Sequence, residues 1–194
     1  MRINSHTGLL EQARLVPSPN ADDRPAGAVP ELIVVHGISL PPGEFGGPWI
    51  DALFTNQLVA DVHPYFAVVR HLKVSAHVLI RRDGEVVQYV PFHRRAWHAG
   101  ASVYCGRARC NDFSVGIELE GADDVRYEAA QYTQLATLIR TLGGAYPTLS
   151  PARVVGHADI SPGRKTDPGA AFDWPRLRRL LGAPRASSSH MAGS

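Results

Sequence analysis

Residues 75–91, SAHVLIRRDGEVVQYVP, carry two runs of apolar and β-branched residues on either side of Asp83-Gly84. An Asp-Gly pair between such runs is a strong local signal for a β-hairpin and favours a two-residue type I′ turn. We therefore predict strands over 75–82 and 85–91. Strand and helix patterns alternate after this hairpin. The sequence thus predicts an α/β or α+β domain, in which a mixed central β-sheet is flanked by helices.

The remaining elements are expected from periodicity and from signals at their ends. Short apolar runs predict buried strands over 31–36 and 152–156, and FSVGIELE alternates as a strand over 113–120. Apolar residues at helical spacing predict helices over 49–60 and 128–142, the second ended by Gly143-Gly144. A third helix is expected over 173–181, with Asp173 as its N-cap.

Composition restricts the class of protein. The chain has 194 residues, of which 44% are hydrophobic and 20% charged, as in an ordinary globular domain. A formal net charge of +2 is too small to indicate nucleic-acid binding. The sequence lacks both an apolar run of about 20 residues and a secretory leader, so we expect a cytoplasmic monomer without membrane contact. Cys105 and Cys110 are then free thiols, although an oxidising compartment would allow a disulfide.

The two ends of the chain differ in composition from its middle. The first 30 residues, rich in Pro, Asn, Asp and Gly, are predicted to form an arm packed on a single domain over 31–183. The last residues, 184–194, are polar and low in complexity, and a disordered tail is expected there.

Three side chains are candidate ligands of one zinc ion. His36 ends the apolar run ELIVVH, and residues 156–169, GHADISPGRKTDPG, supply His157 and Asp167. Two imidazoles and a carboxylate leave a fourth tetrahedral position open, as in catalytic zinc sites. Pro168 favours extended backbone at Asp167, so Lys165, two residues earlier, should face the same space. Spacing alone leaves open that these histidines at strand ends only form hydrogen bonds.

Glu118 is the candidate general base. It shares one face of the strand over 113–120 with Ser114 and Gly116, whose small size leaves room beside the carboxylate. A carboxylate in the middle of a sheet is paired or lines a cavity. Because Glu120 lies on the same face, a solvated face of an edge strand would produce the same pattern.

Several motifs together resemble a known family. They are VVHGISLPPGEFGGPWIDALF (34–54), HPYF (63–66), VSAHVLIRRDGEVVQYVPF (74–92), RAWHAG (95–100), CNDFSVGIELEG (110–121) and GHADISPGRKTDPG (156–169). In these the chain resembles the AmpD-type anhydro-N-acetylmuramyl-L-alanine amidases. They belong to the zinc amidase superfamily, with phage lysozyme-type amidases and peptidoglycan recognition proteins. The resemblance runs from PSPN (17–20) to FDW (172–174).

The resemblance implies one Zn²⁺ held by His36, His157 and Asp167, and catalytic roles for Glu118, Lys165 and Tyr65. It implies hydrolysis of the amide between anhydro-N-acetylmuramic acid and the L-alanine of the stem peptide. The partner is then a small-molecule anhydromuramyl-peptide, handled in peptidoglycan recycling. In many bacteria this lowers the level of muropeptides that induce β-lactamase. Some superfamily members only bind such fragments, and others cleave polymeric cell wall.

Substrate-binding residues are expected at four positions. The indole of Trp97 could carry the sugar, unless it is a core residue, and Arg109, more than Arg107, could meet acidic groups. Gly37 stands where the family usually has a substrate-holding asparagine, and Lys73 stands where arginine is common.

The other histidines of these motifs need not bind the metal. Three protein ligands suffice for a catalytic zinc, so His77 and His98 are expected to be hydrogen-bonded residues near the site.

Overall fold

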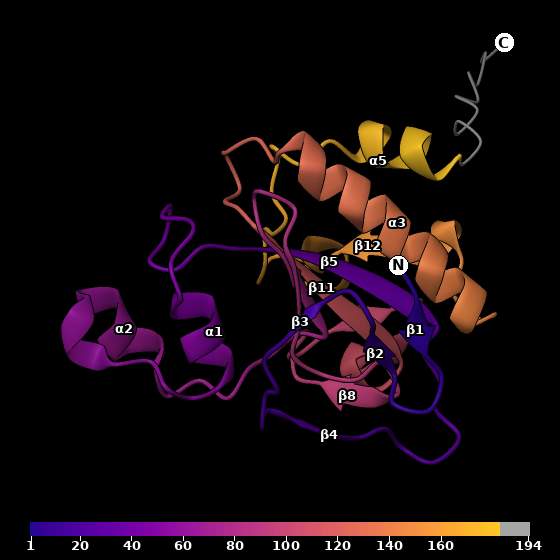
Figure 1. Ribbon diagram of the computed structural model, residues 1–194, viewed down its shortest axis with the longest axis horizontal. Helices are drawn as coiled ribbons and strands as arrows, with labels where there is room; N and C mark the ends of the chain where they lie inside the picture. Colours follow the sequence, from indigo (N-terminus) through magenta and orange to yellow (C-terminus); the bar gives the residue numbers. More distant parts are fainter. Residues whose placement is uncertain (183–194) are drawn as a thin grey trace, which may run out of the picture.

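A six-stranded mixed sheet forms the centre of the protein in a computed structural model that describes residues 1–182 (Figure 1). In spatial order its strands are β12 (Val154–Gly156), β5 (Leu32–Ile38), β11 (Ser114–Glu120), β6 (Val78–Ile80), β7 (Val86–Gln88) and β3 (Arg14–Leu15). The first four run parallel, β7 is antiparallel to β6, and β3 is parallel to β7. The hairpin and the buried strands are therefore confirmed.

Helices cover both faces of this sheet. On one face lie α3 (Ala129–Ala145) and α5 (Trp174–Leu181), and on the other lie α1 (Trp49–Phe54) and α2 (Pro64–Val69) (Figure 1). Short helical segments complete the set: η1 (Ala60–Val62), η2 (Cys110–Asp112), η3 (Pro151–Arg153) and α4 (His157–Ile160). The predicted mixed sheet flanked by helices is confirmed.

The alternation along β11 divides its side chains between these layers. Val115, Ile117 and Leu119 are fully buried in the core that contains α3. The opposite side chains, Glu118 among them, point to the other layer. Since β11 has β5 and β6 as neighbours, it is a central strand, and a solvated edge-strand face is ruled out.

The first residues pair with the domain at several points. β1 (Ile3–Asn4) and β2 (Leu9–Leu10) pair with each other, β3 extends the central sheet, and β4 (Ala21–Asp23) pairs with β8 (Arg94–Ala96). A further small ribbon joins β9 (Val103–Tyr104) to β10 (Arg107–Ala108). The division of the chain at residue 30 stays a prediction. The tail expected over 184–194 lies outside the described residues.

Three local predictions are wrong in detail. The helix predicted to end at Gly143-Gly144 continues through both glycines to Ala145. The register pairs Ile80 with Val86, and Arg81 N–H donates to Glu85 O. Three residues, 82–84, then form the loop, and only Gly84 of these has positive φ, whereas a type I′ turn needs two such residues.

The helix predicted over 49–60 ends at Phe54. The side chains of Ser18 and Asn20 both donate to the carbonyl of Phe54, and Asn56 has a φ of 60°. The first segment of the chain therefore ends the helix.

Among the described residues, no helix is both long enough and apolar enough to cross a bilayer. Cys105 is exposed, Cys110 is buried, and neither forms a disulfide.

Candidate metal centre and catalytic cleft

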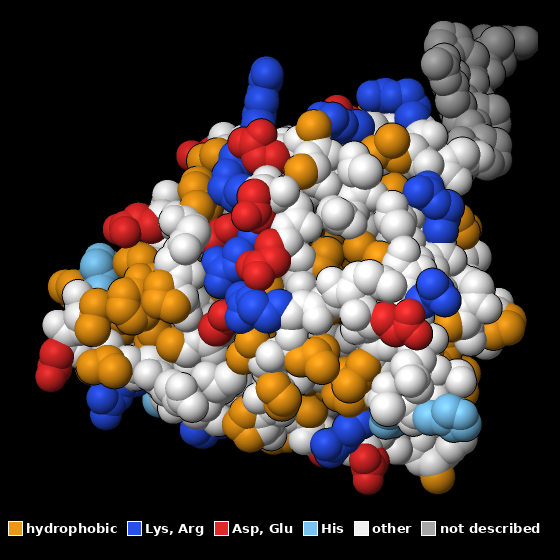
Figure 2. Space-filling view, viewed as in Figure 1, with side chains coloured by type: hydrophobic (Ala, Val, Ile, Leu, Met, Phe, Trp, Pro, Cys, Tyr) orange, Lys and Arg blue, Asp and Glu red, His pale blue; other side chains and the backbone are white. Residues whose placement is uncertain are grey.

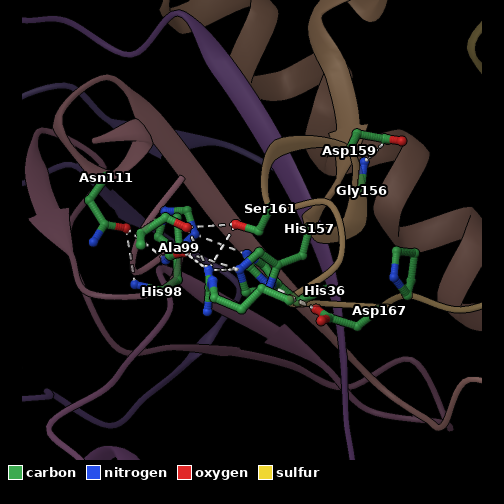
Figure 3. Close-up of polar contacts among 12 residues, drawn as sticks. His36, His98, Ala99, Asn111, Gly156, His157, Asp159, Ser161 and Asp167 are labelled. Carbon is green, nitrogen blue, oxygen red and sulfur yellow. Dashed lines mark hydrogen bonds and ion pairs between the residues drawn. The ribbon is translucent and has the colours of Figure 1, made fainter. Parts of the chain in front are cut away.

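Three of the predicted site residues converge at one point (Figure 3). His36 Nδ1 lies 3.0 Å from His157 Nδ1 and 3.2 Å from Asp167 Oδ2, and His157 Nδ1 lies 3.1 Å from the same oxygen. Both histidines are buried, and Asp167 is partly exposed. The sequence-based expectation that these three side chains meet is therefore matched by the geometry.

The sheet explains this meeting. β12 and β5 are parallel neighbours, with Gly156 beside Val35, so His157 directly after β12 lies next to His36 near the end of β5. The loop after α4 then turns back, and Ala158 N–H donates to Asp167 O. Strand ends at one edge of a parallel sheet thus bring together ligands that are far apart in sequence.

The donor set fits a zinc ion. Ligand atoms about 2.0–2.2 Å from zinc in tetrahedral geometry lie about 3.3–3.6 Å apart. The three observed separations are within a few tenths of an ångström of that range. Burial lowers the pKa of His36 to about 4, so this ring is neutral and offers a lone pair. Burial raises the pKa of Asp167, but its close contacts with the imidazoles of His157 and His36 outweigh it and keep the carboxylate ionised.

Glu118 lies beside this cluster on the neighbouring strand. It is paired in register with His36, is 8% exposed, and lines the same cleft. Its Oε2 is buried and has no hydrogen-bond partner among the described residues. Burial raises the pKa of Glu118 well above its usual value; Asp167 raises it further, and Lys165 opposes the shift. An unpartnered carboxylate with a raised pKa is suited to accept and return a proton.

A cleft of about 610 Å³ opens above these groups. Lys165 and Asp167 both line it, as the spacing around Pro168 suggested. Tyr65, from the first turn of α2, also lines the cleft and is 38% exposed. The cleft therefore contains a carboxylate, an ammonium group and a phenol around the candidate metal centre.

Three predicted substrate residues lie elsewhere. Trp97 is half-buried, and its indole N–H donates to Asp22 of β4, 3.0 Å away. Arg109, with its side chain 71% exposed, pairs with Asp112. Lys73 is exposed. None of the three is among the described residues that line the cleft, and their substrate-binding roles stay predictions.

Gly37 does line the cleft, and its lack of a side chain has a local reason. A Cβ atom added to Gly37 would overlap the hydroxyl oxygen of Tyr127. The ring of Tyr127 would not clash, because its nearest atom, Cζ, would be 3.5 Å from that Cβ. That hydroxyl donates to Pro168 O, next to Asp167. Tyr127 thus occupies the space that a side chain at position 37 would need.

Two features of the cleft were not expected from the sequence. One wall is apolar and comes from the loop after β5 together with α1, α2 and the segment after α2; its residues are Leu40, Pro42, Leu53, Phe54, Val69, Leu72 and Val74. Figure 2 shows hydrophobic side chains gathered at the surface over α2. Arg164 also lines the cleft and donates to Ala99 O and Ala101 O. The sequence offered one signal for Arg164: it directly precedes Lys165 in the segment 156–169, which supplies His157 and Asp167.

Comparisons with known proteins indicate one family. The family model described as N-acetylmuramoyl-L-alanine amidase matches residues 26–170. The 1,6-anhydro-N-acetylmuramyl-L-alanine amidase AmpD of Salmonella typhimurium strain SL1344 is 63% identical over 183 residues, which cover 94% of this chain and 95% of that protein.

Solved structures give the same result. A crystal structure of a selenomethionine derivative of AmpD superposes with a TM-score of 0.90 at 60% identity, over 93% of this chain and 99% of that one. The amidase AmiD of Escherichia coli, in complex with its substrate anhydro-N-acetylmuramic acid-L-Ala-D-γ-Glu-L-Lys, has a TM-score of 0.57 at 29% identity, over 82% and 61% of the two chains.

Proposed function

Because the chain belongs to the N-acetylmuramoyl-L-alanine amidase family and is an AmpD-type member of it, we propose that it cleaves anhydromuramyl-peptides in a zinc-dependent reaction. The bond cleaved is the amide between anhydro-N-acetylmuramic acid and L-alanine. The main support is the placement of Glu118, with its unpartnered oxygen, in one cleft with His36, His157 and Asp167.

The metal would be held by the two imidazoles and the aspartate. Zinc in that position supplies Lewis acidity, which polarises a carbonyl and makes water acidic enough to attack at neutral pH. Asp167 also carries a negative charge that offsets the charge of the cation. The cleft leaves the side of this cluster that faces Glu118 and Lys165 open to substrate.

Glu118 would move the proton. Its unpartnered Oε2 can accept a proton from the attacking water and return it to the alanine nitrogen as the amine departs. The raised pKa favours the return step, because the protonated carboxyl is stabilised by burial.

Lys165 and Tyr65 would act on the scissile carbonyl. The ammonium group of Lys165 can stabilise the oxyanion of the tetrahedral intermediate, a contact typically worth about 2.7–4 kcal/mol of barrier. Tyr65, which also lines the cleft, can orient the carbonyl or the water through its hydroxyl. The apolar wall would receive the sugar or the methyl group of alanine.

We place this reaction in peptidoglycan recycling in the cytoplasm, where it would remove muropeptides that induce β-lactamase. The protein would act as a monomer on a small-molecule partner. This part of the proposal rests on the family resemblance.

The test is a product assay. Zinc-loaded protein is incubated with an anhydromuramyl-tripeptide, and mass spectrometry measures the free peptide. We expect release of the peptide with L-alanine at its new amino terminus, no release after chelation, and strongly reduced release from the Glu118→Gln variant. Intact substrate bound to the wild-type protein would show instead a binding module. Activity on intact sacculi comparable to that on the anhydromuramyl-tripeptide would indicate an enzyme that cleaves polymeric cell wall.

A further inference from the structure

Both histidines of the metal cluster have their second ring nitrogen hydrogen-bonded to one short segment. His36 Nε2 lies 2.9 Å from His98 Nδ1, and His157 Nε2 lies 3.1 Å from the carbonyl oxygen of Ala99 (Figure 3). The two contacts come from adjacent residues, one through a side chain and one through the backbone. All three imidazoles are buried, so water does not compete for these bonds.

From this geometry we infer that the dipeptide His98-Ala99, held by the side chain of Asn111, orients both imidazoles and directs their Nδ1 atoms to the metal. His98 and Asn111 are then positioning residues of the site. This inference rests on the proposed zinc site and adds the part of the chain that fixes its ligands.

The hydrogen bonds require one set of ring tautomers. The Nδ1 atoms of His36 and His157 face each other and Asp167, so each must offer a lone pair there to bind a cation. Each Nε2 then carries the proton and donates it. His98 must therefore accept at Nδ1 and carry its own proton at Nε2, which donates to Ser114 Oγ, 3.0 Å away. Ala99 O has two lone pairs and accepts from both His157 and Arg164.

Asn111 holds this dipeptide from behind. Its Oδ1 accepts from the backbone N–H groups of both His98 (3.2 Å) and Ala99 (2.8 Å). Figure 3 shows Asn111 on the far side of His98-Ala99 from the histidine cluster. One amide oxygen thereby fixes the backbone from which both contacts to the ligands arise.

The ring of His98 packs against the backbone of β11. A Cβ on Gly116 would overlap ring atoms of His98, so the ring lies directly on the glycine backbone. The room expected beside Glu118 from the small Ser114 and Gly116 is thus filled by His98, which contacts Ser114 at its outer end. The small residues on this face of β11 make room for the imidazole of His98, which in turn contacts the proposed ligand His36.

Zinc affinity tests the inference. The dissociation constant for Zn²⁺ is measured by chelator competition for the wild type, His98→Leu, His98→Asn and Asn111→Leu. Losing such an orienting contact typically weakens metal binding about 10- to 100-fold. We expect that loss in His98→Leu and Asn111→Leu. His98→Asn should stay near the wild-type value, because an amide oxygen can take the place of the Nδ1 acceptor.

Asn20→Leu is the matched control. Asn20 is a buried asparagine whose side chain, like that of Asn111, bonds to backbone: it donates to Phe54 O and Val74 O, and it has no hydrogen bond to the three imidazoles among the described residues. It should lower the melting temperature without changing zinc affinity. Unchanged affinity in both His98→Leu and Asn111→Leu, or an equal loss in Asn20→Leu, would overturn the inference. Failure of the wild type to bind zinc would instead overturn the proposed function.

A measurement on the unmodified protein covers the case in which the variants do not fold. Long-range ¹H–¹⁵N NMR spectra of the zinc-loaded, ¹⁵N-histidine-labelled protein report which ring nitrogen carries each proton. We expect His98 to be protonated at Nε2 and unprotonated at Nδ1. A proton on Nδ1 of His98 would contradict the arrangement, since that atom could not then accept from His36.

Discussion

Two carboxylates at the end of β11 lie two residues apart on the same face, and their surroundings differ. Glu120, 2% exposed, accepts from Gly46 N–H, from Arg82 N–H and from the guanidinium of Arg81. Glu118 is similarly buried, yet its Oε2 has no partner among the described residues, and its pKa is raised well above the usual value. The carboxylate of Glu120 is thus hydrogen-bonded within the fold, whereas Oε2 of Glu118 is free to accept a proton.

The contrast separates a structural carboxylate from a reactive one. Buried polar groups in proteins are normally hydrogen-bonded, and an exception needs a reason. Glu120 ties the loop after β5 to the hairpin, beside a surface where Arg14, Glu85, Arg82 and Glu128 form ion pairs. Figure 2 shows acidic and basic side chains close together over this part of the surface. Glu118 faces the cleft and so has a reason to remain unpartnered.

The largest effect is expected from Glu118→Gln, which removes the proton acceptor and keeps the shape. Turnover of an anhydromuramyl-peptide should fall about 10²- to 10⁴-fold, the usual contribution of a general acid–base group. Zinc content and melting temperature should not fall, because Oε2 of Glu118 has no hydrogen-bond partner within residues 1–182. Steady-state kinetics with elemental analysis checks this. Wild-type turnover in a zinc-loaded variant would remove Glu118 from its proposed role.

Lys165→Met should have the next largest effect. Lys165 is the cation that opposes the raised pKa of Glu118, and it lines the cleft beside Asp167. Loss of an oxyanion donor typically lowers kcat about 10²- to 10³-fold. The pKa of Glu118 should also rise, so the lower limb of the pH–rate profile should move to higher pH. Lys165→Arg is the charge-preserving control. A rise in KM alone, with kcat unchanged, would indicate that Lys165 only binds substrate.

Glu120→Gln should affect stability more than chemistry. It keeps an acceptor for one backbone N–H and removes the charge that faces Arg81, although Glu85 still pairs with that arginine. We expect a loss of about 1–3 kcal/mol in the free energy of unfolding, as for hydrogen bonds to charged groups. Urea denaturation measures it. Zinc affinity should be unchanged. If Glu120→Gln lowered turnover as strongly as Glu118→Gln, the distinction between the two carboxylates would fail.

The sequence predicted this site well where the partners lie on regular strands. His36 and Glu118 are neighbours because β5 and β11 pair in register. Glu118 follows from the period-2 alternation of its strand, and His36 follows from the end of a short apolar run, where a strand should stop. His157 follows from the same rule, since it directly succeeds a strand. The position of Asp167 needed the loop spacing and the family resemblance together.

Features decided by contacts between distant segments could not be predicted. The end of α1 depends on Asn20, 34 residues before Phe54. The indole N–H of Trp97 donates to Asp22, 75 residues earlier. The role of Glu120 depends on Gly46 and Arg81, neither of which the alternation of β11 can indicate. Periodicity shows which face a side chain occupies, but not which group from elsewhere in the chain meets it there.

The smallest effect expected concerns the pH dependence of stability in the metal-free protein. The pKa of Glu118 is higher in the folded than in the unfolded chain, mainly because of burial. Its contribution to stability is therefore complete below the unfolded value of about 4.3 and is lost as pH rises towards the folded value. Glu118→Gln does not titrate, so its stability relative to wild type should increase over that range.

Melting temperatures of both proteins, measured with a chelator from pH 4 to pH 8, test this. A gain of 1 kcal/mol corresponds to about 2–4 °C in a domain of this size. The two curves should meet near pH 4 and separate in favour of the variant as pH rises. Zinc should reduce the difference, because a nearby cation favours the ionised carboxylate. A constant difference at all pH values would mean that Glu118 is solvated or paired in the folded protein, as Glu120 is paired.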